Sequence, residues 1–135
     1  MTPAFSVKSA AKVVSFLEQA FGGTLVERYE APGGLIAHAE ILLGDSIVML
    51  GDPMPGSEPR PGTFTYYVDD GEAVDAAYRR ALAAGATSVS EPKNQFYGYR
   101  SAQVEDMGGN RWGISAVIEQ LTPEQIQERM AKLGG

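Results

Sequence analysis

Cysteine is absent from this 135-residue chain, and histidine occurs only once, at position 38. The absence of cysteine excludes disulfides, thiolate metal sites and a cysteine nucleophile. The chain also lacks any apolar run near the ~20 residues that a membrane span requires, and no charged segment followed by an apolar one marks a secretory signal. From these absences we expect a cytoplasmic protein without a membrane partner.

Basic residues are few. Eleven lysines and arginines stand against 17 aspartates and glutamates, which gives a net charge of −6. They are scattered, whereas nucleic acids and anionic membranes require a concentrated basic surface. We therefore expect no nucleic-acid partner. No GxSxG, Walker or GxGxxG motif is present, so serine-hydrolase, nucleotide-phosphate and dinucleotide chemistries have no support in the sequence.

What the chain does contain is a repeated order of elements. Each half has the pattern of a strand, a helix and three further strands, and the two copies are offset by about sixty residues. Module one covers about residues 1–52 and module two about residues 63–118, with a linker rich in proline and glycine at 53–62. With a last helix at 122–133, the pattern predicts a single α+β domain over residues 1–135.

Local signals predict where the first two helices begin and end. Ser9 is expected to cap the first helix, which stops at Gly22-Gly23. Asp69-Asp70 is expected to cap the second helix rather than to act as a catalytic carboxylate pair.

The last helix begins with a capping box, in which Thr122 precedes Pro123 and Gln125 follows at the third helical position. Its apolar residues form only a narrow stripe. Two interpretations stay open: the helix packs on its own sheet, or it clamps a dimer partner. The stripe consists of Ile126, Met130 and Leu133.

His38 and Glu40 lie two residues apart in a predicted strand, Leu35 to Leu43, and therefore point to the same face. The odd positions of this strand are all apolar, so we expect them to pack on the helices while His38 and Glu40 look into a cavity. The pair either orders the sheet through a hydrogen bond or acts as a general base, in which the carboxylate orients the imidazole. Two ligands alone do not make a metal site.

Three stretches resemble the vicinal oxygen chelate superfamily, which includes glyoxalase I, bleomycin-resistance proteins and extradiol dioxygenases. FLEQAFGG at 16–23 resembles its first helix, HAEILLGDSIVMLGD at 38–52 the central hairpin of the PhnB-like subgroup, and YGYRSAQVEDMGGNRWGIS at 97–115 that subgroup's strand, turn and tryptophan. Met107 stands where proline is usual. The resemblance covers essentially the whole chain and implies two tandem βαβββ modules, whose sheets form a cup around a ligand within one chain or across a homodimer.

The resemblance also bears on metal binding. Metal enzymes of the superfamily take His, Gln or Glu ligands from the first and last strands of each module. The matching positions here hold Thr2 or Ala4, Met49 or Leu50, Thr63, and Gly113. None of these is a ligand that a hard divalent cation prefers. We therefore expect the family's metal site to have been lost, with no metal and no cofactor.

Aromatic residues gather on the strands of module two. If Thr63 keeps its cavity-facing position, alternation places Thr65 and Tyr67 in the cavity and Phe64 and Tyr66 in the core. Aromatic side chains on a concave sheet suit flat or hydrophobic ligands.

Two arginines are candidates for the same cavity. Arg100 follows Gly98-Tyr99 and could hold an anionic or carbonyl group. The alternative for Arg100 is an ion pair with Glu105 or Asp106. Arg111 shares the face of Gly113 by alternation.

The sequence supports two functions. The favoured one is metal-independent binding or sequestration of a small hydrophobic or aromatic molecule, as in antibiotic resistance, without catalysis. The alternative is a superfamily isomerase or lyase, with or without a metal, in which His38 and Glu40 transfer a proton. The candidate ligand-binding residues are His38, Glu40, Met49, Thr65, Tyr67, Tyr97, Tyr99, Arg100 and Arg111.

Overall fold

The computed structural model describes residues 1–134 and places them in two four-stranded sheets and three helices. Sheet one has the strand order β1-β4-β3-β2, and sheet two repeats it as β5-β8-β7-β6. In each sheet the first strand pairs in parallel with the last, and the other pairs are antiparallel. The predicted α+β fold of two βαβββ modules is confirmed. The strands are β1 (Ala4–Ser6), β2 (Thr24–Ala31), β3 (Leu35–Leu43), β4 (Ser46–Gly51), β5 (Thr63–Tyr67), β6 (Thr87–Asn94), β7 (Tyr99–Glu105) and β8 (Arg111–Val117).

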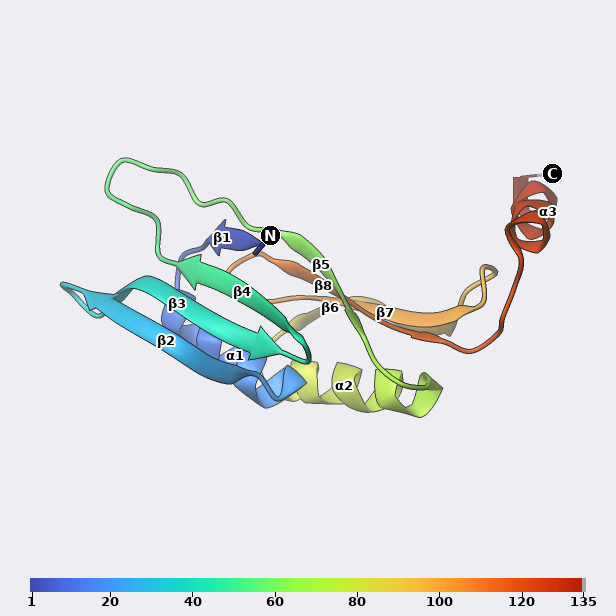
Figure 1. The fold of residues 1–135 in the computed structure, drawn as a ribbon, viewed down its shortest axis with the longest axis horizontal. Helices are drawn as coiled ribbons and strands as arrows, with labels where there is room; N and C mark the ends of the chain where they lie inside the picture. The colour runs from blue at the N-terminus through green and yellow to red at the C-terminus, as the bar shows by residue number, and fades with distance from the viewer. Residues whose placement is uncertain (135) are drawn as a thin grey trace.

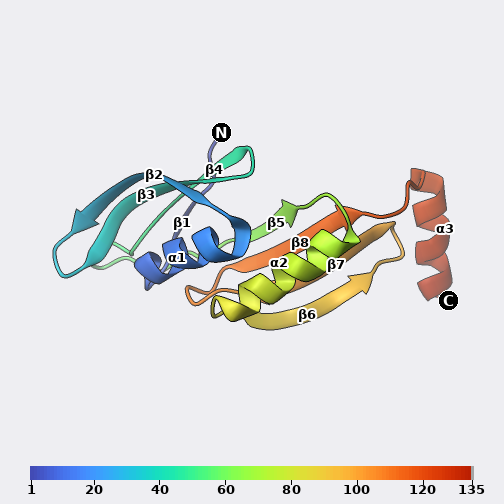
Figure 2. The same cartoon turned by 90° about the horizontal axis from the view of Figure 1, so that it is seen from below.

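The helices cover only one side of the two sheets. Helix α1 (Ala10–Phe21) packs on sheet one, α2 (Gly71–Ala83) packs on the same side of sheet two, and the two helices contact each other (Figures 1 and 2). The core lies on this side. Among residues 1–134, no helix covers the opposite faces of the sheets, which we call the open faces. No helix in this range is long and apolar enough to span a membrane.

Aromatic rings join the two modules where the edge strands β1 and β5 approach each other. Phe5 lies 5.1 Å from Phe64, whose ring stacks on Trp112 at 4.7 Å between centroids. Phe21 stacks on Tyr66 at 4.8 Å. Phe64 and Tyr66 thus pack against the core, as the alternation along β5 predicts.

Short-range signals at the helix ends are confirmed in two places. Asp70 caps α2, because its carboxylate accepts a hydrogen bond from the Ala73 amide at 2.8 Å. Gly22 ends α1 in the left-handed conformation, with φ of 65°.

The cap of α1 differs from the prediction. Ser9 is at the N-cap position, but it has φ of 63° and its side chain makes no capping hydrogen bond. Asp52, which follows β4, supplies the carboxylate instead. It accepts from the Ala10 amide at 3.4 Å and from the Ile36 amide at 2.7 Å, and so connects the start of α1 to β3.

Strand β3 keeps the expected alternation only in its second half. Leu35 and Ala37 were expected to pack on the helices, but both are exposed while Ile36 is buried. The register with β2 skips Ala37, which has no partner. This β-bulge adds one residue, and one extra residue reverses which positions face the core. His38 and Glu40 still point away from the helices, as predicted.

Strand β6 continues through a proline to Asn94. Pro92 lies where the register shifts between Ser90 and Lys93, on an edge strand. A bulge on an edge strand tolerates a residue that has no N–H to donate.

Helix α3 (Pro123–Gly134) stands apart from both sheets (Figure 1). Its capping box forms as predicted, since the Thr122 amide donates to Gln125 at 2.8 Å and the Gln125 amide to the Thr122 hydroxyl at 3.2 Å. Among residues 123–134 none is buried, and Met130 and Leu133 are 50% and 68% exposed. Within this chain, α3 therefore does not pack on its own sheet.

Candidate functional site

The open face of sheet one carries both polar and aromatic side chains. Across β2 and β3, Tyr29 pairs with His38 and Glu27 pairs with Glu40. On the other side of Glu40, its partner is Met49 on β4. Cross-strand partners share a face of the sheet. These five residues therefore form one patch on the side opposite α1.

His38 and Glu40 form the contact that their spacing predicts. The Nε2 atom of His38 lies 2.9 Å from the Glu40 carboxylate, and the two side chains are 38% and 25% exposed. The hydrogen bond with His38 lowers the pKa of Glu40 below its ordinary value. The imidazole also stacks on Tyr29, with 6.3 Å between ring centroids.

Glu27 is a member of this cluster that the sequence analysis did not identify. One ligand atom each from Glu27, His38 and Glu40 lie within 4.8 Å of one another. Glu27 reaches this position because β2 and β3 pair between two register shifts, one at Val26 and one at Ala37. A uniform register would place Glu27 opposite Ala39, which is buried on the helix side. No local sequence signal marks either bulge.

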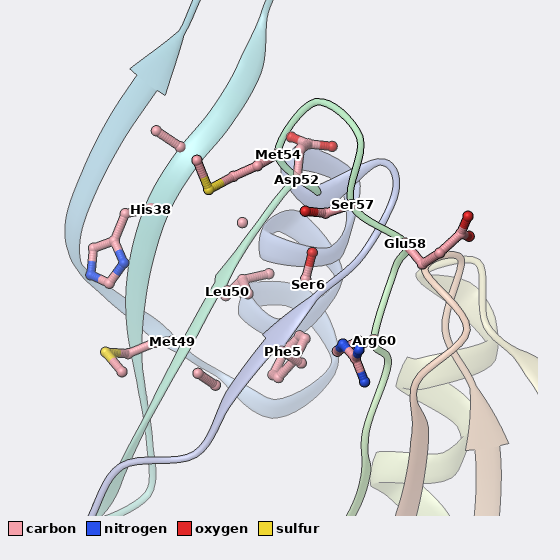
Figure 3. Close-up of a pocket in the computed structure, with 13 residues that line it drawn as sticks. Phe5, Ser6, His38, Met49, Leu50, Asp52, Met54, Ser57, Glu58 and Arg60 are labelled. Atoms are coloured by element: carbon pink, nitrogen blue, oxygen red, sulfur yellow. The ribbon is translucent and has the colours of Figure 1, made fainter.

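A cavity of about 370 Å³ opens beside this patch. His38 and Met49 line one side of it, and Glu58 and Arg60 from the linker line the other (Figure 3). The linker is held in place by backbone hydrogen bonds between Ser6 and Arg60, of 3.2 and 2.7 Å. It therefore forms a wall of the cavity at the edge of β1.

The open face of sheet two carries a row of tyrosines. Tyr67 lies 6.4 Å from Tyr99, and Tyr99 lies 5.5 Å from Tyr97, between ring centroids. Tyr67 is 66% exposed. Beside the row lies a shallow hollow of about 230 Å³ whose lining is polar and uncharged. Its lining includes Thr65, Gln95, Tyr97, Ser101, Gln103, Gly113 and Ser115.

A third cavity, of about 470 Å³, lies where the two modules meet. Thr65 and Tyr67 of β5 line one side, and the turn between β3 and β4 at Gly44 and Asp45 lines the other. Five of the predicted ligand-binding residues are divided among the three hollows: His38, Met49, Thr65, Tyr67 and Tyr97. The other four line none of them: Glu40, Tyr99, Arg100 and Arg111.

Arg100 lies on the helix side of sheet two. Tyr99 faces the open side, so the next residue along the strand points the other way. Arg100 donates to Asp75 on α2 at 2.9 Å and to the Asn94 side chain at 3.0 Å. Neither of its expected partners, Glu105 and Asp106, holds it.

Arg111 pairs with Glu105, which was one of the two partners expected for Arg100. Its guanidinium lies 3.3 Å from the Glu105 carboxylate, and its side chain is 51% exposed. Arg111 pairs with Thr63 across β5 and β8, at the end of the strands away from the tyrosine row.

The positions that hold metal in related enzymes do not suit one here. Ala4 pairs directly with Met49, whereas in module two Thr63 pairs with Arg111 and Gly113 pairs with Thr65. The positions Ala4, Met49, Thr63 and Gly113 offer a methyl group, a thioether, a hydroxyl and no side chain. Hard divalent cations require carboxylate or imidazole ligands in numbers. The family's metal chemistry therefore has no ligand set at these positions.

Comparisons with known proteins agree with this fold. The model of the Glyoxalase/Bleomycin resistance protein/Dioxygenase superfamily matches residues 3–114. The uncharacterised protein Mb0911c of Mycobacterium bovis is 30% identical over 145 residues, which cover 99% of this chain and 93% of that protein. The crystal structure of TioX from Micromonospora sp. ML1 has 26% identity and a TM-score of 0.68, and covers 90% of this chain and 98% of its own.

A more distant structure has the same fold. The fosfomycin resistance protein FosX from Mesorhizobium loti is 19% identical with a TM-score of 0.65, and the match covers 97% of this chain and 95% of FosX. The family model spans most of the chain and the relative from Mycobacterium bovis covers nearly all of it. The protein belongs to the glyoxalase/bleomycin resistance protein/dioxygenase superfamily.

Proposed function

We propose that the protein binds a small hydrophobic or aromatic molecule on its open faces and does so without a metal at the family's ligand positions. The observation that carries this proposal is the row of exposed Tyr67 and half-buried Tyr99 and Tyr97 beside an uncharged hollow. A flat ring can stack on such a row, while hydroxyl and amide groups orient its polar substituents. A ligand that hides about 200 Å² of apolar surface gains about 5 kcal/mol before the costs of association.

The binding site we propose is completed by a second copy of the chain. Among residues 1–134, no helix covers either open face, and Met130 and Leu133 of the apolar stripe on α3 are exposed. A homodimer in which the open faces and α3 meet the partner would enclose the ligand, as the cup implied by the family resemblance does. The hairpin at 38–52 and the strand, turn and tryptophan at 97–115 support a place in the PhnB-like subgroup. We also propose a cytoplasmic location.

Sequestration of an antibiotic is the biological role we propose. FosX, which has this fold, is a fosfomycin resistance protein. A binding protein protects a cell by holding the free drug concentration low, and this role requires a cavity but no reactive group.

The proposal is tested with chelator-treated protein and a panel of planar aromatic natural products. A ligand at about 100 times its Kd stabilises the folded state by about 2.7 kcal/mol, which a thermal shift detects. For each hit, calorimetry on Tyr67→Ala and Tyr99→Ala should show weaker binding. Leu82→Ala, on the outer side of α2, is the control and should bind as the parent does. Equal affinity in all variants would contradict a site on the tyrosine row.

A second candidate function rests on the 2.9 Å contact between His38 and Glu40. A carboxylate that holds an imidazole in one orientation suits proton transfer in an isomerase or lyase. Turnover of a bound compound that falls by about a hundredfold in His38→Ala, with binding retained, would favour this enzyme. Unchanged turnover in His38→Ala would exclude the pair as the proton carrier.

A further inference from the structure

We propose that Glu27, His38 and Glu40 form a binding site for a divalent first-row transition metal on the open face of sheet one. The site lies away from the positions at which the family resemblance places metal ligands, and it goes beyond the ligand binding proposed above. It is built from two adjacent strands of one module, so a single chain supplies all three ligands.

The donor atoms already converge without an ion. Glu27 is the direct cross-strand partner of Glu40, and His38 precedes Glu40 by two residues on the same face. One ligand atom of each lies within 4.8 Å of the other two. The stacking of the imidazole on Tyr29 restricts its orientation. The backbone positions are fixed by β-sheet pairing, which gives metal ligands more precise placement than a loop does.

The local charge favours a cation for a separate reason. Two carboxylates directly opposite each other on one face of a sheet destabilise the pairing. Within residues 1–134, His38 is the only basic group that pairs with either carboxylate. The nearest arginine on β2, Arg28, pairs with Ala39 and so lies on the other face, where its guanidinium is 3.3 Å from Glu30. A divalent cation between Glu27 and Glu40 would replace repulsion with attraction.

The mixed donor set selects the kind of metal. Calcium and magnesium prefer shells made only of oxygen, whereas Zn²⁺, Ni²⁺ and Co²⁺ accept imidazole nitrogen together with carboxylate oxygen. The chain has no cysteine and one histidine, so a site with a nitrogen or sulfur ligand of the usual kinds must use His38. Three protein ligands leave further coordination positions open, toward the cavity that His38 and Met49 line.

The change in geometry that an ion requires is small. Ligand bonds to zinc of about 2.0–2.1 Å at a tetrahedral angle separate two donor atoms by about 3.3 Å. The His38 and Glu40 donors, now 2.9 Å apart, need to open by a few tenths of an ångström. The three ligand atoms lie within 4.8 Å of one another, and the Glu27 carboxylate has to move closer to the other two. Rotation of the exposed Glu27 side chain can provide this movement. The metal would take the place of the hydrogen bond between His38 and Glu40.

The test uses untagged, chelator-stripped full-length protein and Zn²⁺ or Ni²⁺ as the probe. Titration calorimetry should show that one ion binds per chain. Co²⁺ bound at the site should give visible absorption bands that indicate a nitrogen ligand. Since His38 is the only histidine, the imidazole ¹⁵N signals of the whole protein report this site alone. They should shift when Zn²⁺ is added.

Variants distinguish a specific site made by these three residues from nonspecific attraction of a cation to acidic side chains. Glu27→Gln, Glu40→Gln and His38→Gln should each weaken Zn²⁺ binding by at least about tenfold, which is the lower end of the cost of losing even an outer-shell partner. Glu30→Gln is the matched control, because it removes the same charge from the same strand outside the cluster. It should leave the affinity within about twofold.

Two results would overturn the site: no shift of the imidazole signals at millimolar Zn²⁺, or equal loss of affinity in Glu30→Gln and Glu27→Gln. Glu27 is exposed, so its variant tests the site even if a change at His38 prevents folding. The ligand panel for the proposed function is run with chelator and this titration without ligand. A negative result in one experiment therefore does not contradict the proposal that the other experiment tests.

Discussion

Arg129 on α3 donates from both terminal nitrogens to the two carboxylate oxygens of Glu119, at 2.8 and 2.9 Å. One of these nitrogens also donates to the Phe96 carbonyl at 3.0 Å. No residue among 123–134 is buried, so these contacts are a main attachment of the helix to the rest of the chain. The orientation of α3 therefore depends in part on the charge of one exposed carboxylate.

The anchor of α3 should fail in acid. The hydrogen bond from Arg129 lowers the pKa of Glu119, and the same contact raises the pKa of Arg129. A lowered carboxyl pKa means that the interaction is fully present above the ordinary value of about 4.3 and is lost as the pH falls through the lowered one. Carboxyl ¹³C NMR should show Glu119 titrating below the ordinary glutamate value of about 4.3. Titration of Glu119 at or above that ordinary value would contradict an ionic anchor.

A buried network around Asp106 should carry much of the stability of module two. Its carboxylate accepts from the Trp112 indole at 2.8 Å and from the Asn110 side chain at 2.9 Å, and all three side chains are buried. Asp106→Ala removes the acceptor for these two side chains and for the backbone amides of Gly108 and Asn110, so we expect a loss of about 3 kcal/mol in the free energy of unfolding. Urea denaturation measures it. Asp45→Ala, in an exposed turn, is the control and should change stability by less than about 0.5 kcal/mol.

The start of α1 offers a direct contrast between two side chains. Asp52→Ala removes an acceptor for the amides of Ala10 and Ile36, so we expect it to cost about 1–2 kcal/mol. Ser9→Ala should cost only a few tenths of a kcal/mol, because the Ser9 side chain makes no capping bond. Thermal and urea unfolding of both variants measure the difference. If Ser9→Ala lowered the free energy of unfolding more than Asp52→Ala does, Ser9 would act as the helix cap that the sequence predicts.

Features set by neighbours in sequence could be predicted. The capping box of Thr122 and Gln125 and the cap at Asp70 depend on groups three residues apart, and the structure contains both. The βαβββ repeat was predictable for a similar reason, since each strand and helix has its own periodicity.

Features that depend on strand register or on partners far apart in the sequence could not be predicted. The bulge at Ala37 changes the face of Leu35 and places Glu27 opposite Glu40, and nothing local in the sequence specifies it. The carboxylate at the start of α1 comes from Asp52, 42 residues further along the chain. Arg100 pairs with Asp75, 25 residues before it, because α2 packs across β7. Each depends on the assembled sheet.

The apolar stripe of α3 provides the test of the proposed homodimer. Met130 and Leu133 are exposed in one chain, so Met130→Glu should not lower the stability of the monomer. If a second copy covers the stripe, burying the new charge is costly, and the dimer dissociation constant should rise by at least about tenfold. Sedimentation equilibrium measures it. Ala131→Glu, off the stripe on the same helix, should leave dimerisation unchanged, and equal weakening by both variants would argue that net charge and not the stripe controls association.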